Sequence, residues 1–403
     1  MKNKKKWIKF RHRVVRNLAY IVLYPFSLIK YGVQIEKFKE QNGRQYLILL
    51  NHQTTFDQFF VGMAFKGPVY YLATEDIFSN GFISKVIKYI VAPIPIKKQT
   101  SDVKAVMNCI RVAKEGGTIA IAPEGNRTYS GKTEYMNPAI IGLVKRLKLP
   151  VALFRIEGGY GVQPRWSDVL RKGKMRAYVS KVIEPEEYNK LSNNELFDII
   201  REGLYVDDTK LGGMYYHKKS AEYLERAIYV CPQCGLSKFH SKDDIIKCEK
   251  CGLTVKYLPS KELDGKDCDF PFKYVNDWYE YQCDFVNKID LSNYIDKPMY
   301  QDSANLFKVL VYKNKLKLKE SSKISLYGNR IVIDEDTPDE IIMPFEEITA
   351  VSVLGRNKLN IYYDDEVYQL KGDKRFNALK YVNIYYLEKN QVKETVNGKF
   401  LGL

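Results

Sequence analysis

The chain has 403 residues, which is enough for two or three domains with cores of their own. Its 45% of hydrophobic residues and mean hydropathy of −0.35 are typical of a folded globular protein and exclude a polytopic membrane protein. The formal net charge of +16 favours anionic partners, but it does not choose among nucleic acid, phospholipid headgroups and acidic carriers or cofactors.

The first forty residues combine a basic arm with an apolar run. Residues 1–16 hold eight Lys or Arg and no acid, and the run Leu18–Ile29 follows, interrupted by Pro25. This run is too short to span a bilayer, which takes about 20 apolar residues, and no small-residue cleavage site of a signal peptide follows it. We therefore predict a membrane-associating segment over 1–40 that lies at an anionic membrane surface. The alternative is an N-terminal helix packed on the next domain behind a solvated basic tail.

Residues 41–208 alternate short apolar runs with amphipathic stretches, which predicts an α/β domain with a mixed, largely parallel sheet flanked by helices. Ser192 and Glu195 form a capping-box pattern at the start of the last helix. The expected strands cover 46–51, 69–74, 118–123, 150–158 and 175–185, and the expected helices cover 80–90, 102–115, 137–147 and 191–208.

The remaining chain is divided by composition. We expect a charged helical linker over 209–228, a zinc ribbon over 229–258 and a second linker over 259–304. Short alternating strands over 305–395, closed by a helix over 375–389, predict a β-barrel-like domain. Its topology resembles a pleckstrin-homology or GRAM-type domain, although no signature residue supports that resemblance.

Two C-x-x-C-G knuckles lie thirteen residues apart within the predicted ribbon. Together they offer four thiolates, which is a complete tetrahedral set for structural Zn²⁺, so His240 is not needed as a ligand. The alternative is two coincidental pairs or disulfides. The other cysteines show no pattern, which suits a reducing cytosol. The predicted ligands are Cys231, Cys234, Cys248 and Cys251.

A candidate catalytic pair follows the strand over 46–51. His52 and Asp57 are five residues apart, so they would not share a face of one regular helix. They can meet if His52 lies in the turn before a helix and Asp57 in its first turn, where Thr54 or Thr55 could cap the helix. The carboxylate would then fix the imidazole tautomer and leave the other ring nitrogen as a base. Without further support, a chance spacing is the better explanation.

A second candidate element, Glu124-Gly125-Asn126-Arg127, ends the strand over 118–123. Glycine allows close approach of a ligand to the backbone, and the arginine offers a planar fork for phosphate. The alternative is a strand-to-loop turn with a surface ion pair.

Taken together and in this order, these motifs resemble the glycerolipid acyltransferase family, of the 1-acylglycerol-3-phosphate acyltransferase type, over about residues 40–205. The family pattern N-H-x-x-x-x-D corresponds to Asn51–Asp57 and the pattern P-E-G-T-R to Pro123–Arg127. Looser counterparts are Ile94–Lys98 and Leu149–Leu153. The chain departs from the family in having Lys97-Lys98 for Asp-Arg and Asn126 for Thr, and in lacking the Lys and Gly expected after the third motif.

The resemblance implies an O-acyltransferase that moves an acyl group from acyl-CoA or acyl carrier protein, as co-substrate, to 1-acylglycerol-3-phosphate and so makes phosphatidate. His52 would be the base and Asp57 its partner, and the acceptor would be held by Lys98, Glu124, Gly125 and Arg127. The expected location is cytoplasmic, peripheral or monotopic on the inner face of the cell membrane. The alternatives are another lysolipid or glycolipid acceptor, or a non-catalytic membrane-bound scaffold; nucleic acid is not an expected partner.

Overall fold

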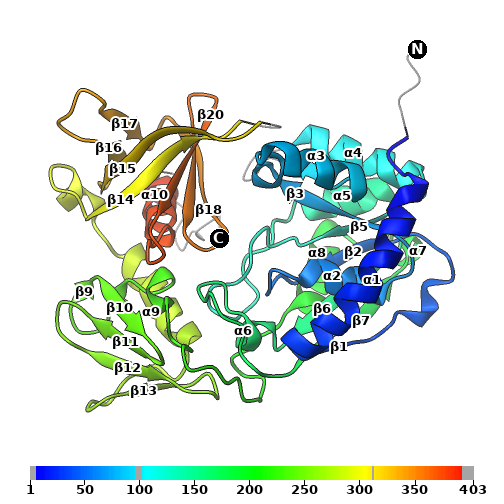
Figure 1. The fold of residues 1–403 in the computed structure, drawn as a ribbon, viewed down its shortest axis with the longest axis horizontal. Coiled ribbons are helices and arrows are strands. Elements are labelled where there is room, and N and C mark those ends of the chain that lie inside the picture. Colours follow the sequence, from blue (N-terminus) through cyan, green and yellow to red (C-terminus); the bar gives the residue numbers. More distant parts are fainter. Residues whose placement is uncertain (1–5, 97–101, 311–312, 393–403) are drawn as a thin grey trace. The chain divides into compact units, whose positions relative to one another are not determined.

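The computed structural model describes residues 6–96, 102–310 and 313–392. The chain divides into two compact units (Figure 1). Unit 1 comprises Met1–Pro164 and Leu170–Tyr216, and unit 2 comprises Arg165–Val169 and His217–Leu403.

A seven-stranded sheet in the order β1-β7-β6-β2-β5-β3-β4 forms the centre of unit 1. Neighbouring strands pair in parallel, except that β6 and β7 are antiparallel, so the predicted mixed sheet is confirmed. The central strands are continuous apolar runs because both of their faces are covered. The strands are β1 (Val33–Ile35), β2 (Leu47–Leu50), β3 (Val69–Thr74), β4 (Ile94–Ile96), β5 (Thr118–Ile121), β6 (Val151–Glu157) and β7 (Met175–Ile183).

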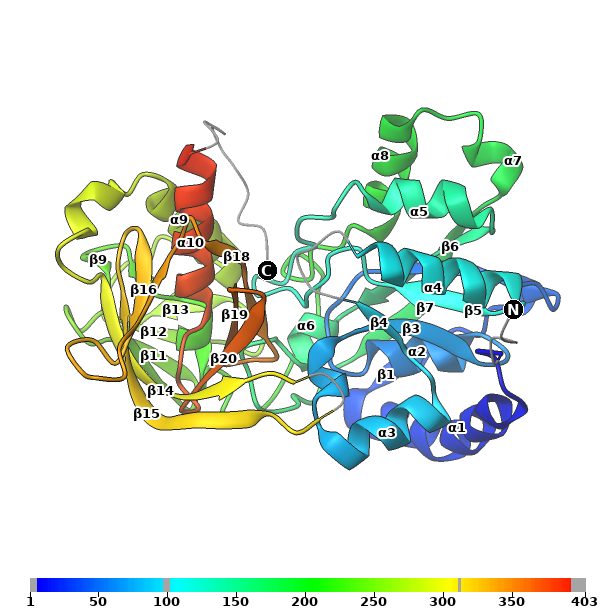
Figure 2. The same cartoon turned by 90° about the horizontal axis from the view of Figure 1, so that it is seen from above.

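Helices cover both faces of this sheet, as expected (Figure 2). Buried side chains of α4, α5 and α8 pack on one face, and those of α1 and α2 pack on the other. The capping box between Ser192 and Glu195 is confirmed. The α-helices are α1 (Phe10–Tyr31), α2 (Asp57–Ala64), α3 (Gly81–Ile90), α4 (Val103–Lys114), α5 (Ile140–Leu147), α6 (Gly159–Val162), α7 (Pro185–Tyr188) and α8 (Asn193–Leu204), with 3-10 turns η1 (Lys39–Gln41) and η2 (Glu75–Phe78).

Helix α1 is packed on unit 1 along one side and exposed along the other. Its C-terminal Tyr31 is buried and stacks on Phe56 at a ring-centroid distance of 5.0 Å. The helix ends at Gly32, where φ is +60° and a Cβ atom would lie only 2.2 Å from the carbonyl oxygen of Gly173, so no side chain fits there. Among the described residues, no helix is both long and apolar enough to cross a bilayer.

The first part of unit 2 contains more structure than the sequence predicted. The helix expected over 209–228 is absent and only the 3-10 turn η3 (Leu224–Arg226) forms there, in a stretch that contains Gly212-Gly213. The supposed linker over 259–304 holds helix α9, whose Trp278 is fully buried. The remaining elements are β8 (Val230–Cys231), β9 (Gly235–Leu236), β10 (Phe239–Lys242), β11 (Ile245–Cys248), β12 (Thr254–Tyr257), β13 (Leu263–Gly265), α9 (Val275–Asn287) and the turn η4 (Leu291–Tyr294).

The C-terminal part of unit 2 is an antiparallel half-barrel with a closing helix, which confirms the predicted fold class. Its strand order is β17-β16-β15-β14-β20-β19-β18. Helix α10 packs against β18, and its residues 379–387 are all buried. The elements are β14 (Tyr300–Lys308), β15 (Leu316–Leu326), β16 (Arg330–Ile333), β17 (Ile341–Pro344), β18 (Ile348–Leu354), β19 (Lys358–Tyr363), β20 (Glu366–Gly372) and α10 (Leu379–Val392).

The short segment Arg165–Val169 belongs to unit 2, although the chain on both sides of it belongs to unit 1. The Arg165 side chain donates hydrogen bonds to the carbonyl oxygens of Val353 and Gly355, both at 3.1 Å. Arg226 donates to the carbonyl oxygen of Trp166 at 2.8 Å, and the Trp166 side chain is fully buried. The sequence predicted one continuous domain over 41–208, so it did not predict that these five residues belong to unit 2.

Candidate active site

The turn between β2 and α2 is fixed by hydrogen bonds to the neighbouring strand β6. The side-chain amide of Asn51 donates to the carbonyl oxygen of Ile156 at 2.8 Å and accepts from the backbone N–H of Ile156 at 2.7 Å. This reciprocal pair holds the chain directly after the strand, so the position of His52 does not depend on a free loop.

His52 and Asp57 meet at this turn. His52 precedes α2 and Asp57 is the first residue of the helix, and the distance from His52 Nδ1 to Asp57 Oδ2 is 2.7 Å. Because a carboxylate accepts, Nδ1 carries the proton and Nε2 keeps its lone pair. The Asp57 side chain is buried, whereas that of His52 is 26% exposed. The pair can therefore accept a proton from a molecule that approaches Nε2.

The Asp57 carboxylate is held by further donors from the same turn. The backbone N–H of Gln53 and that of Thr54 donate to it at 2.7 and 3.0 Å, and the Thr54 hydroxyl donates at 2.6 Å. The Thr54 hydroxyl oxygen also accepts from the N–H of Phe56 at 3.0 Å. Neither of the two threonines considered as caps is the N-cap of α2, which is Phe56 and makes no side-chain cap hydrogen bond. Thr54 instead orients the Asp57 carboxylate.

Thr55 is held by Gln163, which lies beyond β6 in the sequence. The Gln163 side-chain oxygen accepts from the backbone N–H and the hydroxyl of Thr55 at 3.0 and 2.9 Å. No spacing in the sequence relates these residues, which are 108 positions apart. Sequence reasoning missed Gln163 for that reason.

Glu124 supports the turn that carries His52. One of its oxygens accepts from the backbone N–H of His52 and the other accepts from that of Glu134, both at 2.9 Å. Burial raises the pKa of Glu124 to about 8, against the lowering effect of these two donors. Both oxygens have protein partners, so this side chain is placed to position His52.

The loop after Glu124 is joined to the same turn. Gly125 has a φ of +70°, and the space that a Cβ atom would occupy there is open, so its backbone is accessible to a ligand. The N–H of Thr128 donates to the carbonyl oxygen of His52 at 3.1 Å. Arg127 is 7% exposed. Burial raises the pKa of Tyr31 and the positive charge of Arg127 lowers it, so Arg127 lies within electrostatic range of Tyr31, whose hydroxyl is 3.4 Å from that of Thr55 in the His52 turn. Lys98 lies outside the described residues.

The four predicted metal ligands come together in the ribbon. Their sulfur atoms all lie within 4.8 Å of one another, and the distances from Cys231 to Cys251 and from Cys234 to Cys248 are 3.6 and 3.7 Å. Zn–S bonds of about 2.3 Å in a tetrahedron put neighbouring sulfurs about 3.8 Å apart. The side chains present therefore fit a zinc ion, and all seven cysteines lack a disulfide.

Comparison with known proteins supports the predicted resemblance for part of unit 1. Residues 32–155 match the acyltransferase family model. The chain is 23% identical over 193 residues to the 1-acyl-sn-glycerol-3-phosphate acyltransferase LPAT1, chloroplastic, of Arabidopsis thaliana, and the match covers 46% of this chain and 52% of that protein. It is 21% identical over 136 residues to the 1-acyl-sn-glycerol-3-phosphate acyltransferase of Bacillus subtilis, where the match covers 34% of this chain and 65% of that protein.

The chain thus spans about half to two thirds of the length of these curated relatives. Among solved structures, it is similar to the 1-acyl-sn-glycerophosphate acyltransferase PlsC from Thermotoga maritima, with a TM-score of 0.38 and 19% identity over 48% of this chain and 75% of that one. The matched stretch 32–155 contains the His52 turn and the Glu124 loop described above. The resemblance to the acyltransferase family is confirmed for this domain.

Proposed function

Because the matched domain carries the His52–Asp57 pair, we propose that this protein is an O-acyltransferase that converts 1-acylglycerol-3-phosphate to phosphatidate, using acyl-CoA or acyl carrier protein as donor. The observation that carries the proposal is the 2.7 Å contact between His52 and the buried Asp57, which leaves Nε2 as a base at the surface. Relatives with a 1-acyl-sn-glycerol-3-phosphate acyltransferase name support the choice of acceptor.

In the proposed reaction, His52 Nε2 takes the proton of the acceptor hydroxyl while the hydroxyl oxygen attacks the thioester carbonyl carbon. The C–O bond forms first, then the C–S bond breaks, and the imidazolium returns the proton to the leaving thiolate. The products are the new ester and a free thiol, without an acyl-enzyme. Asp57 keeps the tautomer and stabilises the imidazolium throughout.

We assign acceptor binding to the Gly125 backbone and the Arg127 guanidinium, with Lys98 in support, since a phosphate monoester is best held by a planar cation beside an accessible backbone. Glu124, whose oxygens both accept from backbone N–H groups, acts as a positioning residue for His52. A structural Zn²⁺ on the four cysteines would stabilise the ribbon and take no part in this step.

We also propose that α1 and α3 bring the protein to an anionic bilayer on the cytoplasmic side of the cell membrane. Along α1, counting from Phe10 as residue i, the apolar side chains at i, i+4, i+8, i+12 and i+19 are exposed. Neither α1 nor α3 contains an acidic residue. Arg11 joins the helices by donating to the carbonyl oxygen of Tyr89 at 2.7 Å. The α1–α3 surface comprises Phe10, Val14, Leu18, Val22, Ile29, Phe82, Ile83 and Val86.

The experiment that tests the proposed activity measures thioester release by the purified full chain across a panel of lysolipids, with CoA and carrier-protein donors in parallel. We expect release with 1-acylglycerol-3-phosphate and little with the corresponding acceptor that lacks the phosphate. If the protein prefers a glycolipid or another lysolipid, the proposed acceptor is wrong but the proposed acyl-transfer reaction still holds. Absence of release with every acceptor and donor would leave a scaffold that binds membranes and would contradict the enzyme.

A further inference from the structure

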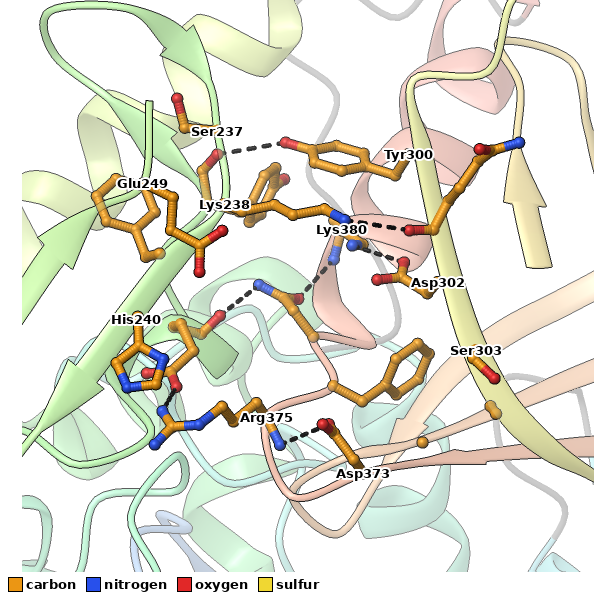
Figure 3. A pocket seen from close by; sticks show the side chains of 18 of the residues that line it. Ser237, Lys238, His240, Glu249, Tyr300, Asp302, Ser303, Asp373, Arg375 and Lys380 are labelled. Carbon is orange, nitrogen blue, oxygen red and sulfur yellow. Dashed lines mark hydrogen bonds and ion pairs between the residues drawn. The ribbon is translucent and has the colours of Figure 1, made fainter. Parts of the chain in front are cut away.

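A cavity of about 710 Å³ lies within unit 2, whereas the residues assigned to acyl transfer belong to unit 1 (Figure 3). One wall is the ribbon around Lys238 and His240, and the opposite wall is the first half of β14. The turn from β20 into α10 closes it on a third side, where Arg375 lies. All lining residues belong to the same compact unit.

The cavity adjoins an unpaired length of strand. Strand β14 pairs with β15 from Tyr300 to Lys308, with register shifts on either side of Leu306, but β20 pairs with it only from Ala304 to Lys308. The chain leaves β20 at Gly372, where a Cβ atom would lie 2.3 Å from the side chain of Phe376, and turns tightly into α10. Among the described residues, no strand pairs with that side of Tyr300–Ser303.

The peptide groups of this free edge point into the cavity. The Lys238 ammonium, from the opposite wall, donates to the carbonyl oxygen of Gln301 at 3.4 Å. Alternate residues of a strand direct their peptide groups to the same side, so the N–H and C=O of Ser303 face the cavity as well. Both side chains are exposed. Such an edge is a template for another extended chain, and a lysine beside it is a common guard.

The charges of the walls indicate what kind of ligand would fit. Apart from His240, four lining side chains are Lys or Arg and four are Asp or Glu. The innermost are already paired, because buried Lys380 lies 2.7 Å from Asp302 and Arg375 pairs with Glu225. A phosphate or nucleotide would meet no surplus of positive charge here, whereas a polypeptide segment without net charge would find partners of both signs.

We propose that this cavity binds an extended segment of a partner polypeptide, without net charge, as a strand added to β14. The segment would exchange backbone hydrogen bonds with Gln301 and Ser303 and displace Lys238 from the Gln301 carbonyl oxygen. At about 3.3 Å per residue, the free edge from Tyr300 to Ser303 takes four residues. This function is separate from the proposed acyl transfer and does not depend on it.

The test uses a display library of random heptapeptides with equal numbers of Lys and Glu, selected against the full zinc-loaded chain. We expect enriched peptides to bind and to slow amide hydrogen exchange in β14. N-methylation of alternate peptide residues should abolish binding in one of the two registers and spare the other, because only one set of N–H groups faces β14. Loss in neither register would contradict strand addition.

Substitutions at one position separate the backbone from the side chain. Ser303→Pro removes the edge N–H, and a proline is tolerated at an edge, so peptide binding should weaken at least tenfold. The matched control Ser303→Ala keeps the N–H and should bind within about twofold of the wild type. Circular dichroism and zinc content check that both variants are folded.

A second variant keeps the proposal falsifiable if Ser303→Pro does not fold. Lys238→Ala frees the Gln301 carbonyl oxygen, so peptides should bind severalfold more tightly. The proposal is overturned if no peptide is enriched, or if peptides bind equally to Ser303→Pro and Ser303→Ala. It is also overturned if a second selection, from a library without the charge constraint, yields only strongly anionic peptides. Acyl transfer, assayed in parallel, should be the same in all three variants whichever way the peptide result falls.

Discussion

His52 is held through its backbone N–H, its backbone C=O and its ring, so its loss should affect chemistry more than folding. The backbone groups bond to Glu124 and Thr128, and the ring bonds to Asp57. We expect His52→Ala to reduce kcat by about 10²–10⁴-fold, the usual contribution of a general base, with an unchanged melting temperature. Asp57→Asn should also be severe, because an amide can hold the wrong tautomer. A folded His52→Ala protein with near-normal turnover would refute the mechanism.

The titration of the Glu124 carboxyl should make the stability of the folded protein depend on pH. Burial raises its pKa from 4.5 to about 8, so the folded protein keeps a proton that the unfolded chain releases above pH 4.5. The contribution of this group to stability is therefore fully present below about pH 4.5 and is lost as the pH rises towards 8. The neutral variant Glu124→Gln lacks this titration.

The expected result is that the melting temperature of the wild type, relative to that of Glu124→Gln, falls as the pH is raised from 5 to 8. Differential scanning calorimetry of both proteins across this range provides the measurement. A constant difference would mean that Glu124 is ionised in the folded protein throughout, and that its two backbone donors outweigh its burial.

Which parts of the site the sequence could predict depends on the range of the contacts. His52 and Asp57 meet through a local turn, so spacing alone identified them as a possible pair. Gln163 reaches Thr55 across 108 residues, and only the folded sheet brings them together. The contact of Glu124 with the N–H of His52, 72 residues away, was missed for the same reason, and the role expected for Glu124 in binding the acceptor stays a prediction.

At the scale of elements, the apolar run near the N-terminus is too short to cross a bilayer, as the sequence predicted, but the sequence did not predict which side of it packs. Tyr31 stacks on Phe56, which directly precedes Asp57, and β1 pairs with β7, so removal of residues 1–33 would damage unit 1 itself. Helix α3, which was expected only as a covering helix, adds Phe82 at 79% exposure to the same surface.

Point substitutions on the α1–α3 surface therefore test membrane contact better than deletion. We expect Leu18→Glu with Phe82→Glu to release the protein from vesicles containing 30% anionic lipid, because each carboxylate would have to enter the acyl boundary. The control Ile342→Glu, on half-exposed β17 of unit 2, should leave binding unchanged. Sedimentation gives the bound fraction, and rising salt should weaken the electrostatic part. A double variant that sediments like the wild type places the contact elsewhere.

The cysteine cluster makes a separate prediction for the ribbon. One zinc ion per chain should be present after purification without chelator, and Cys231→Ser should lose it along with protection of β10–β12 from hydrogen exchange. Cys268→Ser is the matched control, since Cys268 is exposed and lies outside the cluster. Elemental analysis gives the zinc content of each protein. Wild-type protein without zinc, or a loss of zinc from Cys268→Ser equal to that from Cys231→Ser, would contradict a zinc ribbon.

At the scale of the whole molecule, the chain passes into unit 2 twice, first for Arg165–Val169 and again after Tyr216. The first passage is short, yet Trp166 is fully buried and Arg226 is bonded to its carbonyl oxygen. We expect fragments 1–216 and 217–403, produced together, to copurify through this segment. Arg165→Ala with Trp166→Ala should separate them on size exclusion, whereas the control Lys172→Ala should not.

That double passage also governs how such a protein could be rebuilt. A hybrid protein that carries a different C-terminal half, joined at residue 216, would retain Arg165 and Trp166 but lose the part of unit 2 against which these two side chains pack. Trp166 would then become a large apolar side chain in water, and the carbonyl oxygens of Val353 and Gly355 that accept from Arg165 would be missing. A working graft has to exchange two pieces of chain together, five residues from the first half and the whole of the second.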